Sequence, residues 1–213
     1  MSASTPFDYA AWVERARRFV EELARVRGAG IRSTVVATPA ASEQVTAVER
    51  QLGLALPSSL VELFTHGSAG VDCRYVFEPD HETPIFGGAR LGPLSELPDY
   101  SRSVAEWAAE TWVAEEPDQQ AIWRAALPFM RMANGDYLAL DLRNGELDPP
   151  VLYLNHDDDS SIIAPDLATF LLAWERLAYV GPEHWLLLEF TGSHGHLDPE
   201  TRRAADLRRL FDR

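Results

Sequence analysis

The segment centred on Asn134-Gly135 constrains the fold more than any other part of the sequence. This dipeptide is the pair best suited to a type I′ turn, and apolar segments over residues 127–133 and 136–142 flank it. In the second segment, leucine recurs at every other position from 138 to 142, so the leucines share one face of a strand. The sequence therefore predicts an antiparallel β-hairpin.

Further strands and helices surround this hairpin. Apolar runs at residues 151–154 and 161–163 extend it into a meander, and a separate strand is expected near residues 74–77. Residues 78–98 are rich in proline and glycine and predict irregular structure. Helical periodicity and capping residues indicate helices at residues 6–27, 42–53, 57–67, 99–112, 166–179 and 199–211. This order predicts an α+β fold, a single domain in which an antiparallel β-meander of about four to six strands packs with several helices.

The chain shows no internal repeat and no interdomain linker. We expect an α+β core over residues 36–180, an N-terminal helical extension over residues 1–35 and a C-terminal helical extension over residues 181–213. Thr5 is placed to cap the first helix, and Pro6 suits its first turn.

The charge balance limits the classes of partner. Nineteen basic residues stand against 33 acidic ones, which gives a formal net charge of −14. Nucleic acids and anionic membranes bind basic surfaces, so neither is an expected partner. A basic protein partner is expected instead, because charge complementarity speeds encounter. The alternative is that the acidity serves only to keep the protein soluble.

Cysteine usage and the terminus bear on location. Cys73 is the only cysteine, so no intrachain disulfide can form, which favours a reducing compartment. The N-terminal segment lacks the basic and apolar regions of a signal peptide. No uncharged apolar run approaches the roughly 20 residues that a membrane span requires. We therefore expect a cytoplasmic protein.

A set of short motifs occurs in a fixed order between residues 42 and 178. They run Glu49-x-x-Leu52-Gly53-x-x-Leu56-Pro57-x-x-Leu60-x-x-Leu63-Phe64-x-x-Gly67, Gly135-Asp136-Tyr137-Leu138-x-Leu140-Asp141, Pro150-Val151-x-Tyr153, His156-Asp157 and Phe170-Leu171-x-x-Trp174. Most of these residues have a structural explanation, such as Gly53 as a left-handed helix cap and Pro57 at a helix start.

The ordered set resembles the SUKH superfamily, which includes bacterial immunity proteins and fungal cell-wall assembly regulators. The resemblance implies an α+β scaffold, no enzymatic activity and a protein partner. For the bacterial members that partner is a toxin, often a nuclease, delivered between competing cells.

Three clusters could in principle carry chemistry. The run Asn155-His156-Asp157-Asp158-Asp159 could hold a divalent metal, but it lacks the alternating ligands and glycine of a calcium loop. It is interpreted as a solvated turn or a partner-facing patch. Loops at residues 194–196 and 80–82 carry histidines and are interpreted as polar loops. Cys73 is expected to be buried and inert. No nucleophile elbow or phosphate-binding loop occurs, so no catalytic residue, metal or cofactor is predicted.

The leading hypothesis is a non-catalytic protein-binding domain, an immunity protein that neutralises a cognate toxin by covering its active site. The expected partner-binding residues are exposed polar side chains around the meander, namely Asp136, Tyr137, Asp141, His156, Asp157 and Asp158. Secondary candidates are Glu115, Glu116 and Asp118. One alternative is an intracellular scaffold or regulator without a toxin partner. Another is a metal-dependent hydrolase that uses the 155–159 cluster and His194.

Overall fold

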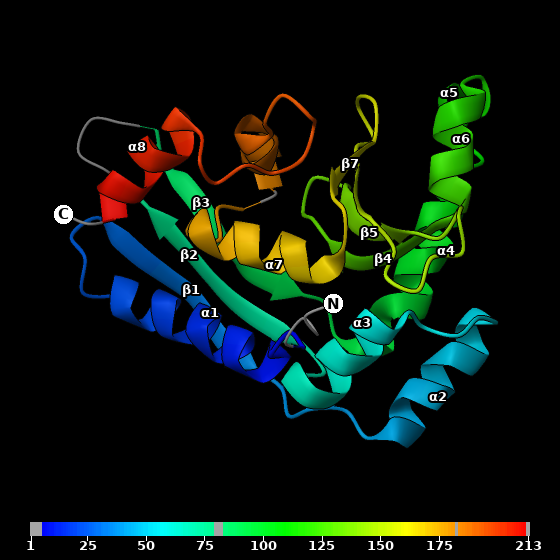
Figure 1. The fold of residues 1–213 in the computed structure, drawn as a ribbon, viewed down its shortest axis with the longest axis horizontal. Helices are drawn as coiled ribbons and strands as arrows, with labels where there is room; N and C mark the ends of the chain where they lie inside the picture. Colours follow the sequence, from blue (N-terminus) through cyan, green and yellow to red (C-terminus); the bar gives the residue numbers. More distant parts are fainter. Residues whose placement is uncertain (1–5, 79–82, 182, 212–213) are drawn as a thin grey trace, which may run out of the picture.

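The protein folds into two antiparallel sheets joined by helices (Figure 1). The computed structural model describes residues 6–78, 83–181 and 183–211. The first sheet has the order β1 (Ala29–Val36), β2 (Val71–Phe77) and β3 (Ile85–Leu91). The second has the order β4 (Ala126–Arg131), β5 (Tyr137–Asp141), β6 (Val151–Leu154) and β7 (Ser161–Ala164). The predicted α+β class is confirmed, with the strands divided between two sheets.

Helices precede, separate and follow the strands. The α-helices are α1 (Tyr9–Leu23), α2 (Ser42–Leu52), α3 (Ser58–Glu62), α4 (Leu97–Trp107), α5 (Thr111–Ala114), α6 (Pro117–Arg124), α7 (Leu167–Arg176) and α8 (Arg202–Phe211). A π-helical turn spans Leu63–Gly67, and 3₁₀ segments span Leu94–Glu96 and Glu183–Phe190. Within the described ranges, no helix combines the length and the apolar character needed to cross a bilayer.

The central hairpin forms where the sequence predicts it, with a different turn. The Gly135 amide donates to the Met132 carbonyl at 3.2 Å, and the Met132 amide donates to the Asp136 carbonyl at 2.9 Å. Gly135 has φ +104°, whereas Asn134 is not among the non-glycine residues with positive φ. A type I′ turn needs positive φ at both positions, so that prediction is wrong. The loop is instead a three-residue turn that closes on a glycine bulge.

Three expectations about local structure are also wrong. Strand β1 was not predicted because it is a half-exposed strand without an apolar stripe. Strand β3 falls in the segment expected to be irregular, because its Gly87-Gly88 pair hides the strand pattern. The acidic stretch after residue 115 lies outside every predicted helix and was expected to be a loop, but it forms α6, with Pro117 at the helix start.

The terminal segments pack into the same core as the strands. The Trp12 indole N–H donates to the Leu171 carbonyl at 3.0 Å, which ties α1 to α7. The Phe211 ring of α8 lies 5.0 Å from that of Phe77 on β2. Asp8 caps α1 by accepting from the Ala11 amide, and Thr5 lies outside the described residues. The boundaries expected at residues 35 and 180 stay a prediction.

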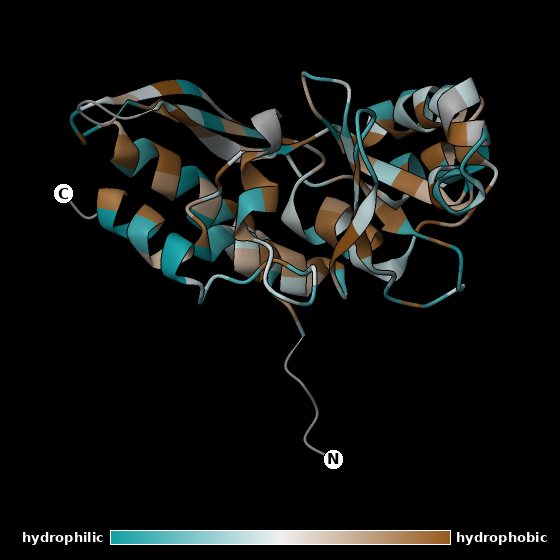
Figure 2. Cartoon of the chain, turned by 90° about the horizontal axis from the view of Figure 1, so that it is seen from above, coloured by the Kyte–Doolittle hydropathy of each residue, from teal (hydrophilic) through white to brown (hydrophobic). Residues whose placement is uncertain are grey.

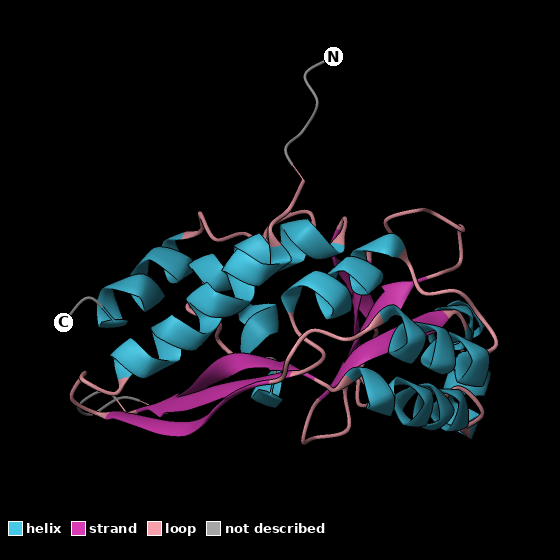
Figure 3. Cartoon of the chain, turned by 90° about the horizontal axis from the view of Figure 1, so that it is seen from below, coloured by secondary structure: helices cyan, strands magenta, loops and turns pink. Residues whose placement is uncertain are grey.

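The three-stranded sheet is covered on one side. Helices α1, α7 and α8 lie together on that side, and they leave the opposite face open (Figure 3). Hydrophobic and hydrophilic segments alternate along these helices, as expected of helices that cover a core (Figure 2). The four-stranded sheet differs because both of its faces are buried. Leu138 and Leu140 belong to the main core, whereas Tyr137 and Ala139 pack into a second cluster with residues of α4 and α6.

Candidate functional site

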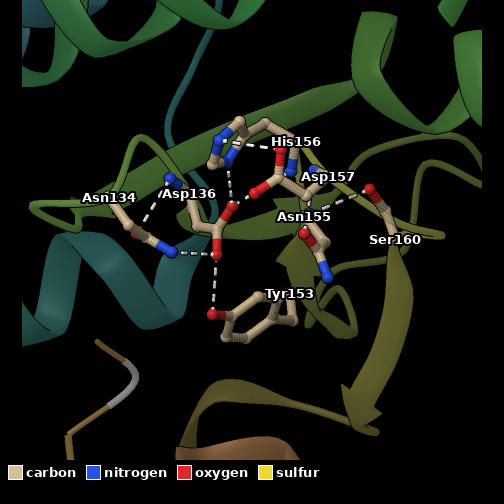
Figure 4. Close-up of polar contacts among 7 residues, drawn as sticks. All are labelled: Asn134, Asp136, Tyr153, Asn155, His156, Asp157 and Ser160. Atoms are coloured by element: carbon tan, nitrogen blue, oxygen red, sulfur yellow. Dashed lines mark hydrogen bonds and ion pairs between the residues drawn. The ribbon is translucent and has the colours of Figure 1, made fainter. Parts of the chain in front are cut away.

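A buried carboxylate organises one end of the four-stranded sheet. Asp136 has no exposed surface and immediately precedes β5, the return strand of the central hairpin. Its Oδ2 accepts from Asn134 Nδ2 at 2.6 Å and from the Tyr153 hydroxyl at 2.8 Å (Figure 4). Its Oδ1 accepts from the His156 amide at 3.0 Å and lies 2.7 Å from His156 Nδ1. Partners from two turns and one strand therefore satisfy the carboxylate.

These bonds make Asp136 a structural tie. A buried charge is tolerated when hydrogen bonds and a partner compensate its lost hydration. Burial, followed by the neighbouring Asp136 charge, raises the pKa of Tyr153, so its hydroxyl remains a donor. The tie connects the turn at residues 132–136 to the turn at residues 155–160. The second turn is thereby held in a fixed place.

A second set of hydrogen bonds shapes the turn at residues 155–160 itself. Asn155 Oδ1 accepts from the Asp157 amide at 3.0 Å, and Ser160 Oγ accepts from the Asn155 amide at 3.2 Å. Gln119 of α6 reaches the end of the turn, where its Oε1 accepts from the Ser160 amide at 2.9 Å and its Nε2 donates to the Ser160 carbonyl at 3.5 Å. The turn is therefore fastened to a helix as well as to the sheet.

The turn, α4 and α6 enclose a groove of 520 Å³, which we call the acidic groove. It is lined by Trp107, Glu116, Gln119, His156, Asp157, Asp158 and Asp159. The ring centroids of Trp107 and His156 lie 5.4 Å apart, and His156 Nε2 lies 3.3 Å from Asp157 Oδ1. Four carboxylates thus surround an aromatic wall. Carboxylates form ion pairs with cations, and an aromatic face also attracts cations. This combination therefore suits a lysine or arginine side chain.

The structure brings together only part of the predicted binding set. His156, Asp157 and Asp158 line the acidic groove, together with the secondary candidate Glu116. Glu115 and Asp118 are exposed nearby and do not line it.

The expected exposure of Asp136, Tyr137 and Asp141 is wrong. Their exposed fractions are 0%, 1% and 2%, respectively. The residues that alternate with the leucines of β5 were expected to face solvent. Tyr100 of α4 covers that face instead, with its ring centroid 6.1 Å from that of Tyr137. Asp141 instead pairs with Arg143, whose Nη2 donates to Oδ2 at 2.6 Å.

Two groove residues escaped sequence reasoning. Trp107 lies on the apolar stripe of a predicted helix, so core packing was its expected role. Gln119 lies in a stretch expected to be a loop, and its contact with Ser160 joins residues 41 positions apart. Only the tertiary arrangement of α4 and α6 over the sheet reveals these two side chains as part of the groove.

The other clusters of chemical interest contribute little to this site. Among the residues that the structure describes, no three or more His, Cys, Asp or Glu side chains converge as they would to hold a metal ion. The Asp80-His81-Glu82 cluster lies outside the described residues. Cys73 is buried, as predicted, and burial raises the pKa of its thiol to about 11.

The fold and the groove define an α+β protein with an ordered acidic groove beside its four-stranded sheet. A family model described as the SMI1 / KNR4 family (SUKH-1) matches residues 39–173, which include every residue that lines the acidic groove. The chain belongs to this family, and the resemblance read from its motifs is confirmed. No curated protein matches the chain.

Proposed function

We propose that this protein is a non-catalytic binding domain that inserts a basic side chain of a partner protein into its acidic groove. The partner that fits the SUKH family best is a toxin domain, which the protein would neutralise as an immunity protein by covering its active site. The carboxylates of Glu116, Asp157, Asp158 and Asp159 around the Trp107 ring carry this proposal.

The rigidity of the groove favours binding. A flexible acidic loop would lose conformational entropy on meeting a partner, and that loss would reduce its affinity. The turn at residues 155–160 is already ordered by hydrogen bonds from Asn155, Ser160 and Gln119. The carboxylates are therefore preorganised for a cation, and the net charge of −14 would also speed its approach.

A matched pair of charge reversals tests the proposal. Asp157→Arg/Asp158→Arg changes the groove, whereas Glu146→Arg/Asp148→Arg changes an exposed loop at the opposite end of the same sheet by the same net charge. Affinity for the toxin domain encoded beside the gene is measured by calorimetry at low and high salt. The groove variant is expected to bind at least about 100-fold more weakly, as loss of two close charge pairs implies, and the loop variant about as well as the wild type.

Protection of cells provides the functional readout. Cells that express the toxin are expected to survive with the wild type and the loop variant and to die with the groove variant. Equal affinity and equal protection for both variants would contradict the role of the groove. Failure of the wild type to protect against any neighbouring toxin would instead favour the scaffold or regulator alternative within the same family.

A further inference from the structure

A second pocket, on the three-stranded sheet, carries the opposite charge. This pocket of 350 Å³, here the arginine pocket, is lined by Arg32, Arg74 and Arg90, one from each strand, together with Tyr75, Phe86, Gly87, Gly88, Met130 and Gly181. Three arginines therefore line one pocket in a chain of net charge −14, and their like charges repel one another. The local sheet structure explains how they are brought together.

A β-bulge places the first arginine. The register between β1 and β2 shifts between Ile31 and Ser33, and Ser33 pairs with Arg74, so Arg32 is the extra residue opposite the second strand. Bulges redirect a side chain from the regular alternation and are frequent beside functional sites. Arg32 therefore joins Arg74 at the pocket although the two residues are not a regular cross-strand pair.

A glycine keeps the floor of the pocket open. Gly88 pairs with Arg74 across the ladder and has φ +112°. A Cβ atom built on Gly88 would lie 2.0 Å from the Cys73 carbonyl oxygen, so no other residue fits this backbone. The position opposite Arg74 on β3 consequently carries no side chain.

The positive charge of the pocket is only partly neutralised. Arg74 pairs with Asp72, with Nη2 donating to Oδ2 at 3.0 Å. Asp72 also lies opposite Arg90 in the ladder, yet neither Arg90 nor Arg32 forms an ion pair with any residue in the described part of the chain. Two of the three arginines that line the pocket therefore lack an ion-pair partner among the described residues.

We propose that the arginine pocket binds a small organic anion through a phosphate or carboxylate group. Guanidinium groups present paired N–H donors that match the oxygens of both groups. Phe86, which is half-buried, supplies apolar surface for the organic part, and the pocket volume falls within the range of small-molecule sites. This site is separate from the acidic groove and does not depend on the proposed toxin partner.

Calorimetric titration of the full chain tests this site with two probes, phenyl phosphate and benzoate. The variant Arg32→Gln/Arg90→Gln removes the charges of the two pocket arginines that have no ion pair in the described part of the chain. The control Arg25→Gln/Arg50→Gln removes two exposed arginines elsewhere with the same change in net charge. Circular dichroism confirms that both variants keep the fold.

At least one probe is expected to bind the wild type saturably and the control variant with the same affinity. The pocket variant is expected to lose at least about tenfold in affinity for each arginine removed. Saturation by phenyl phosphate alone assigns a phosphate ester, and saturation by benzoate alone assigns a carboxylate. No saturable binding of either probe, or an equal loss in both variants, overturns the proposal.

Discussion

A buried aspartate lies at each end of β5, with Asp136 just before the strand and Asp141 as its last residue, but the two carboxylates are satisfied in different ways. Asp136 accepts from Asn134, Tyr153 and His156, which belong to two separate turns and a neighbouring strand. Among the described residues, the Asp141 side chain accepts hydrogen bonds only from its near neighbour Arg143. One aspartate therefore fixes tertiary structure, whereas the other fixes only a local loop.

The loops beside these aspartates differ accordingly. The turn at residues 155–160 is fastened to β5 and α6 and lines the acidic groove. The loop at residues 142–150 is also acidic, but Leu147 at its centre is 88% exposed. Both loops are acidic, but only the turn at residues 155–160 carries the binding role that we propose. The order imposed on its acidic residues distinguishes the groove from the loop.

The largest effect is expected from Asp136→Ala. This change leaves the Tyr153 hydroxyl and the His156 amide without their acceptor in a buried place. We expect the free energy of unfolding to fall by about 2–6 kcal/mol, because each of the two buried donors left without an acceptor costs about 1–3 kcal/mol. Urea denaturation measures it, with the exposed Asp148→Ala as the control. A loss no larger than that of the control would contradict the role of Asp136 as a tie.

A smaller and pH-dependent effect is expected from Asp141→Asn. Burial opposes ionisation of Asp141, but hydrogen bonds from Arg143 outweigh it and hold its pKa below the ordinary value. The stabilisation by the carboxylate is therefore complete above the unfolded pKa of about 3.9 and is lost as pH falls through the lower folded pKa. We expect the variant to be about 1–2 kcal/mol less stable at pH 7, as for one charged hydrogen-bonded pair.

Urea denaturation of both proteins from pH 7 down to pH 2 checks this sign. The gap between wild type and Asp141→Asn is expected to close in acid. A gap that stays constant or widens as pH falls would show that the Asp141 charge does not stabilise the folded state.

The smallest effect on stability is expected from Gln119→Ala. It removes both hydrogen bonds to Ser160 and is expected to cost about 1 kcal/mol in urea denaturation. Its effect on partner binding is expected to be larger than its effect on stability implies, because the end of the turn at Ser160 then has to become ordered on binding. The neighbouring Gln120→Ala is the control. Unchanged partner affinity for Gln119→Ala would show that the order of the groove does not contribute to partner affinity.

The sequence predicts the four-stranded sheet well and the three-stranded sheet poorly. Strands β5 and β6 are apolar runs bounded by turn residues, so pattern alone locates them. Strand β1 is half-exposed and β3 contains two glycines, so pairing with β2 rather than composition defines them.

The site shows the same limit. The Asp157-Asp158 patch is visible in the sequence, but the burial of Asp136 is not. Its partners Tyr153 and His156 lie 17 and 20 residues away and meet it only through the sheet register. Tyr137 was likewise expected to be exposed, because no sequence signal shows that α4 covers the second face of the sheet.

Amide hydrogen exchange of the protein with and without its cognate toxin domain tests the central claim most directly. Exchange reports local opening and its suppression by a partner, segment by segment. Binding is expected to slow exchange in residues 155–160 and in α6, and to leave the loop at residues 142–150 unchanged. Slower exchange confined to the 142–150 loop or to α1, with residues 155–160 unaffected, would contradict the assignment of the acidic groove as the binding surface.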